Sequence, residues 1–458
     1  MTMSLSTGLI SGMDTGSLIA QLVAAEGAPQ TALKSRLSEA QNAASAYRTV
    51  NTTFLAVSAA AETAMKAETW SPTKATSSTP SVAVSATTGA ATASLSFTVK
   101  SVAATHSAVS TTRWASTSTA AGLGSITVKS LDGTTSKGTV PLDGTESLSA
   151  AAAKINKAAL GVTASVIQTN TNQYALQLTS TKSGADASFS LGGAETFKVT
   201  TAGKNAELTI GSTTDAYSVF SASNTFEGVM AGTTITVSKE ESTPVTVSVV
   251  SDPDSVATKV SALVDAVNAA LTTTKSYTSN APGSTAALKG DYSVTSLAGR
   301  LLDAVSRAVG DDGSPAKLGI ELTRDGKVTF DKAKFLTALK ADQTVAQRMI
   351  AGAPADNGPN GVVGGGDDVA AVTGLAGRLL NVAKAASDTT TGTLVAMANG
   401  QDSQAKDIQT RIEAWDLRLA KRKETLTRQF TAMETALSSL RNQSTWLAGQ
   451  INSLPSSS

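Results

Sequence analysis

The chain contains no cysteine and one histidine, His106, among its 458 residues. The absence of cysteine excludes disulfides, thiolate metal sites and thiol catalysis. A lone histidine cannot build a multi-histidine metal site, and histidine acid–base catalysis would rest on this one residue. We interpret His106 as a strand residue within a β-rich region.

Aromatic residues are also scarce, at 4% of the chain, and the formal net charge is only +1. With so little net charge, no global field attracts nucleic acid or an acidic membrane. No stretch approaches the roughly 20 apolar residues of a membrane-spanning helix, so we expect no membrane insertion. The first apolar run, residues 18–25, has no Lys or Arg before it. It therefore does not resemble a Sec signal peptide.

What the chain does have is a heptad pattern at each end. Apolar residues that recur in steps of three and four form a stripe that needs a partner helix. The N-terminal stripe comprises Leu33, Leu37, Ala40, Ala44, Tyr47, Phe54, Ala61 and Met65. The C-terminal stripe comprises Ile408, Ile412, Trp415, Leu419, Leu426, Phe430, Met433, Leu437, Leu440, Leu447, Ile451 and Leu454. We therefore predict that both termini pair in one helical, coiled-coil leg domain.

Between these ends the apolar period changes from 3.5 to 2, which is typical of half-buried strands. Asp-Gly and Gly-Gly turns separate the strands, and one helix at about residues 148–159 interrupts them. The order strand–strand–helix–strand–strand over residues 123–191 predicts a compact α+β module. The fold class is thus multidomain α+β, with two β-rich head domains, one inserted into the other.

These patterns divide the chain into seven segments. A flexible N-terminal segment with a short helix is expected at 1–28, and the N-terminal leg helix at 29–72. The inner β head domain is expected at 73–112 and 205–250, interrupted by the outer α+β head domain at 113–204. A helical leg domain is expected at 251–401 and the C-terminal coiled-coil helix at 402–458, with the last two helices at about 369–398 and 402–452.

Few segments resemble a site of chemistry. Residues 361–366 are rich in glycine but lack the Gly-Lys-Ser/Thr ending of a phosphate-binding loop. Residues 325–331 lack the acidic spacing of a calcium loop and predict a hairpin turn. Basic residues at 411, 418, 421–423 and 428 are interleaved with acidic residues at 413, 416 and 424, which favours a solvated helix face over a nucleic-acid site. We therefore predict no enzymatic activity, no cofactor, no metal and no nucleic-acid partner.

Several blocks of sequence carry a family resemblance. They lie at residues 8–19 (GLISGMDTGSLI), 26–29 (EGAP), 224–237, 318–331, 427–434 (TRQFTAME) and 444–447 (STWL). In this order they resemble the bacterial flagellar filament-capping family, also called hook-associated protein 2. One departure is Gly27, where the family often has arginine or a similar polar residue. Residues 113–204 match only loosely.

The resemblance implies a structural role without catalysis. Such a protein forms a ring-shaped homo-oligomer at the distal tip of the flagellum and guides insertion of exported flagellin subunits. Its implied partners are itself, flagellin, hook–filament junction proteins, the flagellar type III export apparatus and an export chaperone. Export by that route implies an extracellular location without a Sec signal. Head domains of some members also mediate adhesion to surfaces.

We expect the contacts with the filament and between subunits to lie on the two terminal stripes, which we predict are only partly paired in the monomer. Aromatic and leucine anchors dominate such interfaces. The candidate interaction residues are Leu9, Leu18, Leu22, Leu33, Leu37, Tyr47, Phe54, Ile412, Trp415, Leu419, Phe430, Met433, Leu437, Trp446, Leu447 and Ile451.

Two alternative functions remain open from the residues. A hook–filament junction protein would share the helical termini, but its ends would resemble flagellin. A surface adhesin or fibre protein would show long β repeats or a trimer-forming heptad, and neither is present in the sequence. An enzyme would need convergent polar groups in a cleft, and the sequence offers no such constellation.

Overall fold

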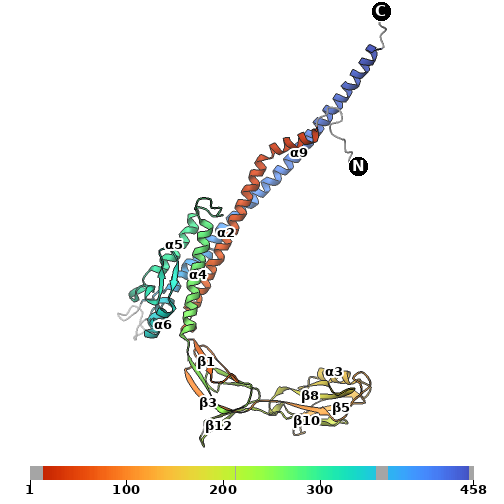
Figure 1. Ribbon diagram of the computed structural model, residues 1–458, viewed down its shortest axis with the longest axis vertical. Coiled ribbons are helices and arrows are strands. Elements are labelled where there is room, and N and C mark those ends of the chain that lie inside the picture. Colours follow the sequence, from red (N-terminus) through yellow and green to blue (C-terminus); the bar gives the residue numbers. More distant parts are fainter. Residues whose placement is uncertain (1–13, 212, 357–369, 453–458) are drawn as a thin grey trace, which may run out of the picture. The chain divides into compact units, whose positions relative to one another are not determined.

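The computed structural model describes residues 14–211, 213–356 and 370–452, without the side chains of residues 451 and 452. The chain divides into two compact units. The helical unit combines Met1–Lys66 with Ala257–Ser458, and the β-rich unit is Ala67–Val256. Figure 1 shows helices in the first unit and mostly strands in the second. The predicted fold class is thereby confirmed.

Two long helices run through the helical unit. Helix α2 (Ala28–Met65) packs along α9 (Thr393–Asn452) in the opposite direction (Figure 1). A shorter helix, α1 (Thr15–Glu26), precedes α2 and also packs against α9. Gly27 separates α1 from α2, and Pro29 lies in the first turn of α2. Proline is tolerated there because the first N–H groups of a helix have no intrahelical partner.

Shorter elements complete the helical unit and share its core with the long helices. Asp252 caps the first of them, accepting the Ser255 N–H at 3.2 Å, as its position before Pro253 predicts. Asn268 bonds both the N–H and the C=O of Val328, which fixes the hairpin on that helix. These elements are α4 (Pro253–Thr278), α5 (Tyr292–Ser306), β16 (Ile320–Leu322), β17 (Val328–Phe330), α6 (Lys332–Ala341), α7 (Gln343–Ala351) and α8 (Leu375–Ser387).

The last two helices differ from the predicted ones. The expected break near residue 400 is wrong, because α8 ends at Ser387 and α9 runs unbroken from Thr393 through Gly400. The turn between them is built by Asp388, whose carboxylate accepts the N–H groups of Thr390 and Thr391 at 2.9 and 2.8 Å. An interior glycine costs a helix only about 1 kcal/mol, which packing offsets. Residue 402 therefore begins no new element.

The inner part of the β-rich unit holds a core between two antiparallel sheets. A five-stranded sheet has the order β1-β15-β3-β11-β12, and a three-stranded sheet has the order β13-β14-β2. Phe97, Leu208, Phe226 and Ile235 are among the buried residues of this core. The strands are β1 (Thr73–Ser77), β2 (Val82–Ala86), β3 (Ala93–Ser101), β11 (Ala206–Ile210), β12 (Tyr217–Ser221), β13 (Thr225–Glu227), β14 (Thr233–Val237) and β15 (Glu241–Ser251).

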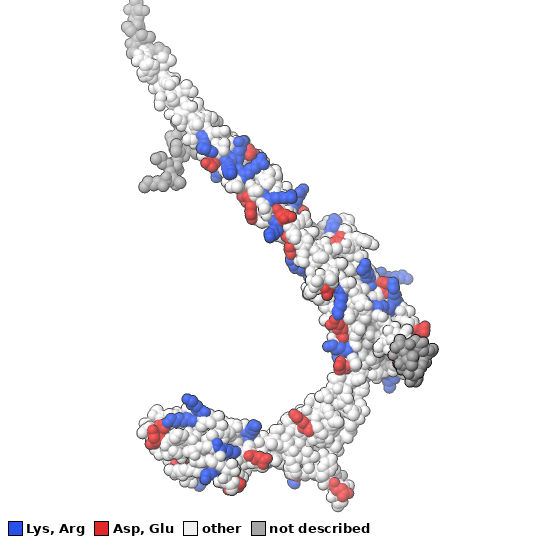
Figure 2. Space-filling view, turned by 180° about the vertical axis from the view of Figure 1, so that it is seen from behind, with Lys and Arg blue, Asp and Glu red and all other residues white. Residues whose placement is uncertain are grey.

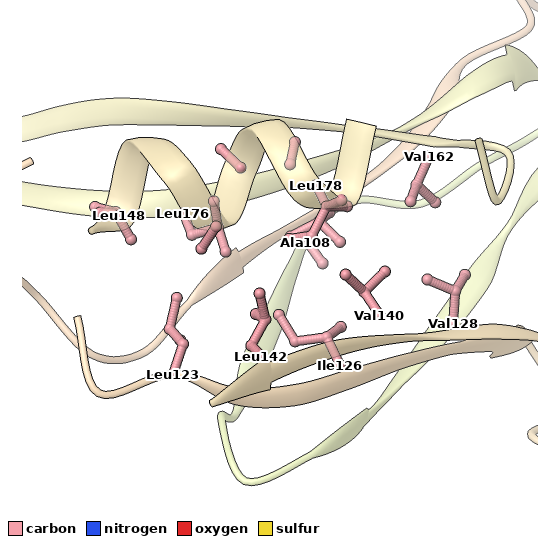
Figure 3. Close-up of a cluster of buried hydrophobic side chains, with 14 of the residues drawn as sticks. Ala108, Leu123, Ile126, Val128, Val140, Leu142, Leu148, Val162, Leu176 and Leu178 are labelled. Atoms are coloured by element: carbon pink, nitrogen blue, oxygen red, sulfur yellow. The ribbon is translucent and has the colours of Figure 1, made fainter. Parts of the chain in front are cut away.

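The outer part has a second core between a four-stranded sheet, β10-β4-β8-β7, and a three-stranded sheet, β6-β5-β9. In Figure 3, Leu148 of helix α3 (Leu148–Lys157) lies with Leu176 on one side of this core and faces Leu123 and Leu142 on the other. The strands are β4 (Thr105–Ser110), β5 (Gly124–Ser130), β6 (Ser136–Asp143), β7 (Val162–Asn170), β8 (Gln173–Ser183), β9 (Phe189–Gly193) and β10 (Phe197–Thr201).

One strand belongs to a different core from the one that the sequence predicted. Residues 105–110 were expected in the inner domain, which was bounded at residue 112. Instead, β4 pairs with β8 and β10, and Ala108 lies in the outer core. The interpretation of His106 as a strand residue is correct, but strand pairing is a long-range property that the local sequence pattern does not encode.

His106 lies in β4 and is buried. Its ring meets the Phe189 ring edge-on, with centroids 4.7 Å apart, and its Nδ1 accepts the Gly203 N–H at 3.4 Å. Burial lowers the pKa of His106, because the protonated ring would lose its hydration. The neutral imidazole therefore packs as part of the β-rich unit.

We expect Phe54→Ala to destabilise the helical unit by about 3–5 kcal/mol, because it empties a fully buried site. The neighbouring Leu55 is 44% exposed, so Leu55→Ala is the matched control and should cost well under 1 kcal/mol. Urea unfolding followed by circular dichroism measures both. Equal effects of the two substitutions would contradict the packing of α2.

We expect the free energy of unfolding of the β-rich unit to fall as the pH drops below about 6.5, the ordinary pKa of histidine. The unfolded chain binds a proton on His106 there, whereas the folded chain, with its lowered pKa, resists it. Because His106 is the only histidine, His106→Gln should remove this slope. Urea titrations between about pH 7.5 and pH 5.5, above the range in which carboxylates ordinarily titrate, test the expectation. A slope in that range that survives the substitution would refute it.

Candidate functional site

The two ends of the chain are aligned by polar contacts along the α1–α2 and α9 seam. As residue numbers rise on the N-terminal helices, those of their partners fall on α9, so the helices are antiparallel. Each pair joins two residues that are 354 to 396 positions apart in the sequence. The pairs are Glu26 Oε1–Arg422 Nε at 2.8 Å, Gln30 Nε2–Asp416 Oδ1 at 2.5 Å, and Arg48–Asp402.

Burial along the α9 stripe decreases toward the C-terminal end of the helix. Ile408, Ile412 and Leu426 are buried, as a paired seam requires. Four further predicted residues are half-buried: Trp415, Leu419, Phe430 and Met433. Beyond them the apolar side chains are exposed, by 37% at Leu437, 60% at Leu440, 67% at Trp446 and 54% at Leu447. We call these last four residues the distal face.

The register explains where the burial ends. Glu26 lies opposite Arg422, and α1 begins only eleven residues earlier, at Thr15. Counting the same distance along the antiparallel α9 reaches the neighbourhood of Met433. Within the described part of the chain, the distal face therefore has no helix opposite it. A heptad stripe without a partner is an exposed apolar surface on an otherwise polar helix.

The candidate residues of α1 and α2 also differ in burial. Tyr47 and Phe54 are buried and Leu33 and Leu37 are half-buried, whereas Leu18 and Leu22 of α1 are exposed. In α1 the inward position is instead Ile19.

The prediction that Met65, at the C-terminal end of α2, belongs to the buried stripe is wrong. Met65 is exposed and Ala64 is buried in its place, because the seam follows the helical period of 3.6 and drifts from a strict heptad. Leu9 and the side chain of Ile451 lie outside the described residues.

Tyr47 forms a bond that the heptad pattern could not reveal. Its hydroxyl donates to Asp291 Oδ2 at 2.5 Å, and Asp291 Oδ1 accepts the N–H groups of Ser293 and Val294 at the start of α5. Burial and the neighbouring carboxylate together raise the pKa of Tyr47. One carboxylate thus caps α5 and ties it to α2. The signal in the sequence was Asp291 at an N-cap position.

The motifs considered for chemistry have structural roles where they are described. Gly326 forms the turn of the β16–β17 hairpin with φ +75°, which favours glycine, and Asp331 caps α6 by accepting the Lys334 N–H at 3.0 Å. Within residues 14–211, 213–356 and 370–452, no three acidic or histidine side chains are grouped so as to hold a metal ion. Residues 361–366 lie outside the described ranges.

No helix in the described ranges combines the length and the apolar character needed to cross a bilayer.

Family comparison identifies the class of the chain. The model of the flagellar hook-associated protein 2 N-terminus matches residues 11–106, and that of its C-terminus matches residues 203–442. The flagellin hook IN motif matches residues 125–182, in the outer part of the β-rich unit. The C-terminal match alone covers more than half of the chain. The chain therefore belongs to the flagellar hook-associated protein 2 family, which confirms the resemblance seen in the sequence.

Individual relatives agree with this assignment. Flagellar hook-associated protein 2 of Escherichia coli (strain K12) is 25% identical over 478 residues, covering 97% of each chain. The crystal structure of the D1-D2-D3 domains of the flagellar cap protein FliD from Escherichia coli is similar with a TM-score of 0.57 at 23% identity. That match covers 78% of this chain and 99% of the other, and it shows a common fold.

We expect Tyr47→Phe to destabilise the helical unit by about 2 kcal/mol, since it removes a hydrogen bond to a charged, partly buried carboxylate. Tyr292 is 82% exposed on the neighbouring helix, so Tyr292→Phe is the control and should leave stability unchanged. Thermal and urea unfolding of the two variants measure the difference. Similar stabilities would show that the Tyr47–Asp291 bond contributes nothing.

Proposed function

We propose that this protein is the structural cap of the bacterial flagellar filament. It forms a ring-shaped homo-oligomer at the distal tip and guides exported flagellin subunits into place. The observation that carries the docking part of this proposal is the distal face of α9. Leu437, Leu440 and Leu447 are exposed there along the stripe, with the exposed Trp446 beside Leu447, and an apolar surface of this kind gains free energy when a partner covers it.

The docking step follows from the same geometry. The helix is already formed, so its backbone loses little further freedom on binding, and the contact gains chiefly from burying Trp446 and its leucine neighbours. Aromatic anchors contribute most to such interfaces. The nearer part of the stripe is half-buried at Phe430 and Met433 and can exchange partners as subunits are added.

Insertion of flagellin would need no nucleotide, metal or cofactor on this view. The driving free energy would come from the folding and packing of flagellin, while the cap supplies a moving template. Flagellin, the hook–filament junction proteins, the flagellar type III export apparatus and an export chaperone are the proposed partners. The protein would act outside the cell at the filament tip, and its head domains would also mediate adhesion.

The alternative of a hook–filament junction protein is not favoured, since models for both ends of hook-associated protein 2 match this chain. A general surface adhesin is disfavoured for the same reason.

We expect Leu447→Asp to abolish filament growth by placing a charge in the docking contact, while both units stay folded. Leu417 is exposed to a similar degree, 60%, on the same helix but outside the stripe, so Leu417→Asp is the matched control. A strain lacking the gene is complemented with wild type or either variant. Electron microscopy of filaments and the amount of flagellin released into the medium are then measured.

Short or absent filaments and released flagellin should appear with Leu447→Asp alone. Normal filaments with Leu447→Asp would refute the role of the distal face. Normal filaments in the uncomplemented strain would refute the capping function itself.

A further inference from the structure

We propose that a groove between α2 and α9 binds an acidic amphipathic helix of a partner protein. The groove has a volume of about 570 Å³ and lies on one flank of the antiparallel seam, apart from the distal face. Three of its lining side chains are Arg36, Arg411 and Arg418, and its apolar floor includes Leu33 and Trp415. We call it the arginine groove. The proposal goes beyond filament capping and does not rest on it.

The three guanidinium groups of the groove have no acidic partner among the described residues, whereas neighbouring cations do. Arg422 of α9 binds Glu26 at the end of α1, and Arg48 of α2 binds Asp402 of α9. The antiparallel register also brings Arg36 of α2 to the level of Arg411 of α9. Two like charges that share a groove repel each other, so an anion between them is favoured.

The cations are arranged for a helix-shaped ligand. Arg411 and Arg418 are seven residues apart on α9, which is a distance of about 10 Å along the helix axis. Carboxylates at positions i and i+7 of a partner helix lying along the groove have the same spacing. The guanidinium of Arg418 lies 4.8 Å from the centroid of the Trp415 ring, a cation–π contact that restricts its position. The Arg418 side chain therefore loses less conformational entropy when a partner binds.

The floor of the groove selects an amphipathic partner over a simple polyanion. Leu33 and Trp415 are half-buried, and the small side chains of Ala32 and Ala414 leave room above them. An apolar side chain fits between the arginines, with carboxylates on either side of it. A protein helix with acidic residues one or two turns from a leucine or similar residue provides both features.

A nucleic acid fits this surface less well. Figure 2 shows acidic side chains interspersed with basic ones along the helical unit. Glu413 and Asp416 lie on α9 beside the groove, where they would repel a continuous phosphate backbone. Discrete carboxylates on a helix can contact the arginines and avoid these acids.

The test uses the full chain and a fluorescein-labelled helical peptide with a central leucine and glutamates at i and i+7. A second peptide has glutamine in place of glutamate. The groove variant is Arg411→Glu with Arg418→Glu. The control variant is Lys406→Glu with Lys421→Glu, which makes the same change in charge on the same helix outside the groove. Circular dichroism verifies that both variants fold.

Fluorescence anisotropy should show binding of the glutamate peptide to wild type and to the control variant. Binding should weaken at least about tenfold in the groove variant and with the glutamine peptide, and it should weaken with salt. No binding to wild type, equal binding by the two variants, or tighter groove-dependent binding of a thymidine oligonucleotide would overturn the proposal. The capping function is tested separately, because Leu447→Asp should leave peptide binding intact.

Discussion

The structure depends on one contact, the apolar seam that packs the N-terminal helices against α9. It joins residues almost four hundred positions apart, as the Glu26–Arg422 and Gln30–Asp416 pairs show. The entropy lost in closing so long a loop grows only logarithmically with its length. A seam with Val50, Phe54 and Val57 fully buried can therefore hold the two ends together although an entire β-rich unit intervenes in the sequence.

The same seam determines which candidate residues are available to partners. Where α1 and α2 lie opposite α9, the apolar side chains of the stripe are buried within the helical unit. Tyr47, Phe54 and Ile412 therefore stabilise the fold instead of facing a partner. Past the level of Thr15, where α1 begins, no helix of the described residues lies opposite α9, and the apolar side chains there are exposed. The heptad pattern is continuous across this point, so one sequence pattern serves as core at one end and as an exposed surface at the other.

That continuity also sets the limit of prediction from sequence. Periodicity predicted the paired termini and the β-rich middle, and Asp252 before Pro253 predicted a helix N-cap, because each is a local signal. It could not assign β4 to the outer core, since strand pairing is decided by distant partners. It placed a break between residues 398 and 402, although α9 runs unbroken through this segment. The exposure of Trp446 and Leu447 depends on where α1 begins. The apolar pattern of α9 holds no information about that position.

The arginine groove and the distal face differ in what they can recognise. The distal face is apolar, so its contacts are stabilised in proportion to the apolar area that they bury. They depend little on salt or on the partner's charge. The groove places fixed cations around a small apolar floor, so its contacts depend on charge and spacing, which favour specificity and rapid association more than affinity. A helical unit that carries both can hold one partner firmly through its end while it exchanges acidic partners along its side. The two surfaces can act independently because the rigid α9 helix keeps them on separate turns.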